Sequence, residues 1–207
     1  MVKRSLEGEP EFQNIYTTFD EKIRRYLTRL VGETEADDLT QEVFIRVSQG
    51  LKDFRGTSKL STWIYRIATN TALDKLRSPS FQRLTQEMLL IDSEEREEDT
   101  YIQLRGSVSS IDQQLIRKEM NKCIRNVIKK LPEDYRTVIV LSELEELRNH
   151  EIAAILQVSL DRVKIRLRCA RAKLKKELAC LCSFYRDERN VLSCDLQSAM
   201  RHLKESD

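Results

Sequence analysis

The sequence predicts an all-α protein of two small helical domains joined by a flexible acidic linker, the second domain containing a helix-turn-helix. Only five glycines and three prolines occur in 207 residues, and this scarcity suits long helices better than sheets, which need more turn residues. Apolar residues recur at helical spacing over two stretches, 10–79 and 112–178. The stretch between them, 80–111, has a different, carboxylate-rich character.

Three helices are expected in the first domain. The first helix ends in a turn near Gly32, and Thr34, which two carboxylates follow, is expected to cap the second helix. The second helix carries apolar residues on one face. After a polar loop, the third helix is expected from about 62 to 77, where Ser78-Pro79 ends it.

The linker is expected to be flexible because of its charge. Residues 92–99 hold six carboxylates and one arginine, and a like-charge block of this kind buries too little apolar surface to order itself. Its acidity would repel DNA, or would serve solubility alone.

The second domain carries the pattern of a helix-turn-helix. A short apolar helix ends near Gln157, Ser159 is placed to cap the next helix, and a stripe of buried positions follows. Many such turns have glycine where this chain has Gln157, and a left-handed backbone there would cost about 1 kcal/mol. The stripe consists of Val163, Leu167, Ala170 and Leu174.

The second helix of this motif is strongly basic. Residues 161–177 contain eight lysines and arginines against two acids, a net charge of +6 in a chain whose total is +2. A solvated helix face would explain a basic run alone, but next to a turn and a cap the run indicates a phosphate-binding surface.

The first domain has a weaker nucleic-acid signal in residues 53–77. A polar loop, a tryptophan and a tyrosine precede a helix with basic and amide side chains, a combination that can stack unpaired bases and pair with the backbone. Trp63 taken alone is more readily explained as a core residue.

Four segments in order carry a resemblance to a known family: EADDLTQEVFIRV (35–47), LSTWIYRIATNTALDKLR (60–77), LPEDYRTVIVLSELEELRNHEIAAIL (131–156) and SLDRVKIRLRCARAKL (159–174). Together they closely resemble the extracytoplasmic-function group of bacterial sigma factors. The resemblance implies region 2 at 10–79 and region 4 at 112–178. It also implies a non-catalytic specificity subunit whose partners are core RNA polymerase and promoter DNA, with an anti-sigma factor as a further partner.

The resemblance also assigns surfaces. The helix of the first segment would dock on polymerase through Asp37, Asp38, Leu39, Gln41, Glu42 and Phe44. The loop 54–62 would capture a flipped base of the −10 element, and the following helix would lie beside the melting duplex with Trp63, Arg66, Asn70, Asp74 and Arg77. The −35 element would be read by Ser159, Arg162, Lys164, Arg166, Arg168 and Arg171. Cys169 stands where relatives often have arginine, so their promoter preference cannot be transferred.

Residues 179–207 extend beyond the usual end of the family. Cys180, Cys182 and Cys194 suit zinc, copper(I) or cadmium in a reducing compartment, and similar extensions in this group sense metals. The alternative is a short amphipathic helix whose cysteines are small hydrophobes. Redox sensing by the same thiols is a related interpretation.

Other function classes fit less well. The chain has no glycine-rich phosphate loop and only two histidines, so no enzyme is expected, and DNA binding needs no cofactor. With no apolar run long enough for a bilayer and no secretory signal, a cytoplasmic location without membrane insertion is expected. The main alternative is a helix-turn-helix regulator that binds duplex DNA without polymerase. A metal-responsive interaction protein is a third interpretation.

Overall fold

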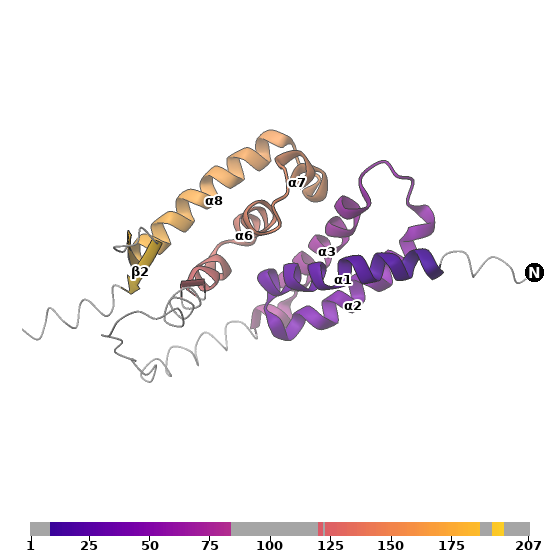
Figure 1. Cartoon of the computed structure of the whole chain (residues 1–207), viewed down its shortest axis with the longest axis horizontal. Helices are drawn as coiled ribbons and strands as arrows, with labels where there is room; N and C mark the ends of the chain where they lie inside the picture. Colours follow the sequence, from indigo (N-terminus) through magenta and orange to yellow (C-terminus); the bar gives the residue numbers. More distant parts are fainter. Residues whose placement is uncertain (1–8, 84–119, 122, 187–191, 197–207) are drawn as a thin grey trace, which may run out of the picture.

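A computed structural model describes residues 9–83, 120–121, 123–186 and 192–196 (Figure 1). Both domains are helical, as predicted. The elements are α1 (Glu9–Val31), α2 (Glu33–Gly50), a 3₁₀ turn η1 (Leu51–Asp53), α3 (Leu60–Arg77), α6 (Glu133–Ile139), a π-helical turn η2 (Val140–Leu144), α7 (Asn149–Leu156), α8 (Leu160–Leu181), β1 (Cys182–Arg186) and β2 (Leu192–Leu196). Residues 79–83, 120–121 and 123–130 are also helical. Most of the predicted linker lies outside the described residues.

The first domain packs α1, α2 and α3 around one core. Ile23, Leu27, Val43 and Ile64 are fully buried, and each such side chain contributes roughly 1.5–3 kcal/mol. The predicted cap at Thr34 is wrong: α2 begins at Glu33, and the residue before it is Gly32 with φ of +100°. Because this backbone conformation favours glycine, the turn itself ends α1 and starts α2 without a side-chain cap.

The second domain contains the predicted helix-turn-helix, formed by α7 and α8. Gln157 closes α7 in the left-handed conformation, with φ 54° and ψ 42°, so the backbone conformation considered for this turn is present. The cap is confirmed as well, because the Arg162 amide donates to Ser159 Oγ at 3.2 Å. Pro132 stands one residue before α6, at its N-cap.

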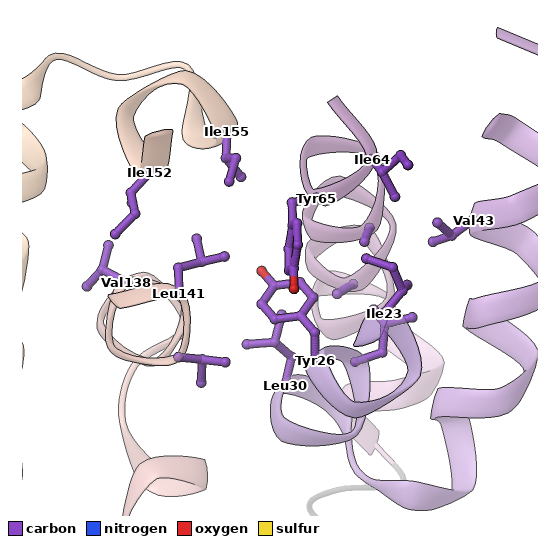
Figure 2. Close-up of a cluster of buried hydrophobic side chains, with 14 of the residues drawn as sticks. Ile23, Tyr26, Leu30, Val43, Ile64, Tyr65, Val138, Leu141, Ile152 and Ile155 are labelled. Carbon is purple, nitrogen blue, oxygen red and sulfur yellow. The ribbon is translucent and has the colours of Figure 1, made fainter. Parts of the chain in front are cut away.

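The two domains pack directly on each other. Figure 2 shows Tyr26, Leu30 and Tyr65 of the first domain facing Leu141 and Ile155 of the second. These residues are buried and belong to one continuous apolar cluster. This interface has no counterpart among the features predicted from the sequence, which indicated two domains joined only by a linker.

Polar contacts border the apolar interface. Arg136 of α6 donates to the backbone oxygen of Leu30 at 2.8 Å, near the end of α1, where the helix dipole favours a cation. Glu145, just after η2, accepts hydrogen bonds from Arg29 and Tyr65. Helix α3 packs against α7 along the same boundary.

Where it is described, the C-terminal segment is not the amphipathic helix given as the alternative interpretation. Helix α8 continues to Leu181, and the chain then forms two antiparallel strands, β1 and β2. In their register Cys182 pairs with Leu196 and Phe184 pairs with Cys194. No helix among the described residues is long and apolar enough to cross a membrane.

Candidate nucleic-acid and docking interfaces

One face of α8 is buried and the opposite face is open to solvent. Val163, Leu167 and Ala170 pack into the core of the second domain. The outward face carries Asp161, Arg162, Lys164, Ile165 and Arg168, all exposed. An exposed face rich in basic residues on the second helix of such a motif has the form of a surface that enters the major groove.

Two arginines predicted for this face instead pair within their own domain. Arg166 Nη2 lies 2.8 Å from Asp134 Oδ2 on α6, and its side chain is only 22% exposed. Arg171 donates to Glu143 Oε1 at 2.6 Å and remains 57% exposed. Position 166 is three residues after the buried Val163 and four before the buried Ala170, so its side chain borders the buried stripe and reaches sideways to α6.

Sequence reasoning missed two exposed apolar residues on α8. Ile165 is 56% exposed and Leu160 is 41% exposed. The helical period contained a signal for Ile165, because this residue lies outside the buried stripe and shares a face with Asp161 and Arg168. Ile165 was missed because the basic run was judged by its charged residues alone.

The residues predicted for the −10 element lie along α3 in two groups. Asn70, Asp74 and Arg77 are exposed, while Trp63 and Arg66 are half-buried. Arg66 Nε is buried and has no hydrogen-bond partner among the described residues. Arg77 Nε donates to Glu133 Oε1 of the second domain at 2.8 Å, so its guanidinium is engaged at the domain boundary.

Trp63 is both a core residue and a neighbour of the predicted base-capture loop. Its ring packs against the core, and a Cβ on Gly50 would stand 3.0 Å from its Cζ2 atom. Its centroid also lies 5.1 Å from that of Phe54, which belongs to the predicted base-capture loop. Trp63 therefore anchors this loop to the folded domain.

The same loop reaches the second domain. Lys59 Nζ lies 2.9 Å from Glu151 Oε1 of α7. This hydrogen bond, and a second one from the Arg148 amide, lower the pKa of the Glu151 carboxyl. The loop is thus tied to the helix-turn-helix in this arrangement.

The predicted docking helix, α2, has an acidic outer face. Asp37, Asp38 and Gln41 are exposed, and Glu42 pairs with Arg46 at 2.5 Å. Leu39 and Phe44 are only 5% and 3% exposed, because both side chains pack into the core, and they offer little surface to a partner. Ile45, which sequence reasoning missed, is 56% exposed on this helix.

The predicted metal ligands are only partly described. Cys180 is exposed at the end of α8, whereas the side chains of Cys182 and Cys194 lie outside what the structure describes. No group of three potential metal ligands stands together among the described residues.

Family models match both domains. The Sigma-70 region 2 model matches residues 15–81, and the Sigma-70, region 4 model matches residues 121–174. These ranges include α2, α3, α7 and the outward face of α8.

Relatives match over most of the chain. The ECF RNA polymerase sigma-E factor of Haemophilus influenzae is 30% identical over 179 residues, 86% of this chain and 93% of the relative. The ECF RNA polymerase sigma factor SigW of Bacillus subtilis is 33% identical over 184 residues, 86% and 94% respectively.

The fold is similar to solved structures. CnrH, in complex with the cytosolic domain of CnrY, superposes with a TM-score of 0.57 at 22% identity, covering 84% of this chain and 90% of that one. The sigma factor RpoE of Bartonella quintana, with the anti-sigma factor NepR, gives 0.55 at 19% identity, covering 82% and 97%. From the two family models and the relatives at 30% identity or above, this chain belongs to the sigma-70 family, in its extracytoplasmic-function (ECF) group.

Proposed function

We propose that this chain is a non-catalytic specificity subunit that binds core RNA polymerase and directs it to promoters. The observation that carries the proposal is the separation of two unlike surfaces. The outer face of α2 is acidic with one exposed isoleucine, whereas the outer face of α8 is basic. An acidic face repels DNA but suits a protein partner, and a basic face suits phosphates.

The −10 element would be engaged from the first domain and the −35 element from the second. Asn70 and Asp74 are exposed on α3, beside the loop that Phe54 and Trp63 anchor. On α8, Arg162, Lys164 and Arg168 are exposed, and the ion pair of Lys164 is with Asp161 of the same helix, so these side chains can reach DNA without breaking a contact to another helix. Such a chain acts in the cytoplasm, where its polymerase works, and an anti-sigma factor would regulate it.

The alternative, a regulator that binds duplex DNA without polymerase, has no need for the α2 surface. The two functions separate in transcription assays with purified core polymerase and a promoter library. We expect promoter-dependent initiation only when the chain is present. Asp38→Lys with Gln41→Lys should abolish initiation and retain binding to an isolated −35 duplex. Binding of the wild type to the −35 duplex without any promoter-dependent initiation would instead favour the alternative.

A second function, metal or redox sensing by the C-terminal cysteines, rests on the hairpin. Its register places Cys194 opposite Phe184, two residues from Cys182, and Cys180 is two residues earlier at the exposed end of α8. Three thiols within one short segment suit zinc, copper(I) or cadmium. If they act as a sensor, added metal or oxidant should alter initiation by the wild type. Cys180→Ser, Cys182→Ser and Cys194→Ser should each remove that response, whereas Cys123→Ser should leave it.

A further inference from the structure

Ile165 occupies the middle of the outward face of α8. Asp161 stands one turn before it, Lys164 beside it and Arg168 almost one turn after it, and all are exposed. The opposite stripe, from Val163 to Ala170, is buried in the domain core, so the orientation of the helix is settled by its own packing. Ile165 therefore points away from the domain, toward whatever α8 binds.

Exposed large apolar side chains are unevenly placed on this protein. The four among the described residues are Tyr16, Ile45, Leu160 and Ile165. Two of them lie on α8 and one on the outer face of α2. A solvated helix that only needed charge for phosphate contacts would have no use for isoleucine at the centre of its basic face.

We propose that Ile165 reads a thymine of the −35 element through the C5-methyl group of that base. The major groove presents this methyl group only at thymine, and apolar side chains contact it there. Arg168 and Lys164, one on each side, are long enough to hold phosphates or guanine edges while Ile165 is pressed onto the base pair. This inference rests on the proposed −35 recognition by α8 and adds a specificity-determining residue to it.

The expected effect is set by one methyl group. Removing a buried methyl group changes affinity about four-fold, which corresponds to ~0.8 kcal/mol. Replacing thymine by deoxyuridine removes that methyl group and leaves all hydrogen-bonding groups in place. The substitution therefore isolates the apolar contact from charge and hydrogen bonding.

The test uses holoenzyme assembled from the full chain and core polymerase. A −35 element is first selected from a randomised promoter, and each thymine in it is then replaced singly by deoxyuridine. Wild type should lose about four-fold affinity at one position. Ile165→Ala should show no deoxyuridine penalty there, and Ile165→Val should keep most of it. Lys175→Ala, an exposed change further along α8, should weaken binding without altering the penalty.

The outcomes separate the two levels of inference. If no element is selected at all, the proposed function fails and the role of Ile165 with it. If an element is selected but no thymine position responds to deoxyuridine, or Ile165→Ala keeps the penalty, only the role of Ile165 is overturned.

Discussion

The Tyr65 hydroxyl donates a hydrogen bond of 2.6 Å to Glu145 Oε2 and so joins α3 of the first domain to the turn before α7. Burial raises the pKa of Tyr65, and the hydrogen bond to the carboxylate raises it further. The hydroxyl therefore remains protonated and keeps its role as donor throughout the physiological range. Tyr26 packs edge-on against the same ring, at 5.2 Å between centroids.

Tyr65→Phe should destabilise the folded chain by about 1.5 kcal/mol. The change leaves the packing of the ring intact but removes one hydrogen bond to a charged, mostly buried carboxylate. Urea unfolding followed by circular dichroism measures the loss. Tyr135→Phe is the control, because no hydrogen bond of that hydroxyl is found in the part of the chain that the structure describes. Equal losses in the two variants would mean that the contact with Glu145 contributes nothing specific.

Gln157→Gly should stabilise the second domain by about 1 kcal/mol. The left-handed backbone at this position strains any residue with a Cβ atom, and glycine adopts it without that cost. Gln157→Ala keeps the Cβ atom and should bring no comparable gain. Thermal unfolding of both variants checks the prediction, and a lower melting temperature for Gln157→Gly would contradict it.

How far the sequence predicts this protein depends on how local the signal is. The helices and the turn at Gln157 were predictable because each rests on a few neighbouring residues. The pairing of Glu145 with Arg29 was not, since it joins positions 116 residues apart and has no signature in either segment. Arg136, which caps α1 from the other domain, was missed for the same reason.

The burial of some candidate-site residues went unnoticed for a different reason. Leu39 and Phe44 lie on the same apolar stripe as Val43 and Val47, so periodicity already placed them in the core. The family resemblance covered the whole docking helix and did not separate its two faces. The same happened with Arg166 on α8. All residues of the basic run were assigned to DNA, although some point outward and Arg166 points sideways, toward α6.

The Arg171–Glu143 pair should make stability depend on pH. The hydrogen bond from Arg171 is the main cause of the lowered pKa of Glu143. A carboxyl with a lowered folded-state pKa adds stability above its ordinary pKa, and this contribution is lost as the pH falls through the folded value. Wild type should therefore exceed Glu143→Gln in urea midpoint at pH 7, by a small margin because the pair is exposed. The difference should shrink as the pH falls below the ordinary pKa of glutamate and vanish below the lowered pKa of Glu143; a difference that persists at still lower pH would contradict the assignment.

Arg166 and Arg168 should respond in opposite ways to alanine substitution, although both lie in the basic run of α8. Arg166 is bonded to Asp134 within the domain, so Arg166→Ala should lower the melting temperature and leave the salt dependence of promoter binding unchanged. Arg168 is exposed on the outward face, so Arg168→Ala should leave the melting temperature unchanged.

If Arg168 neutralises one phosphate, its loss should reduce the slope of log affinity against log salt by about 0.9. If it contacts a guanine edge instead, affinity should fall ten-fold or more for the selected element only. Thermal unfolding and promoter binding by the assembled holoenzyme at several salt concentrations distinguish these outcomes, and a stability loss for Arg168→Ala with normal DNA binding would place that side chain in the fold and not on the DNA.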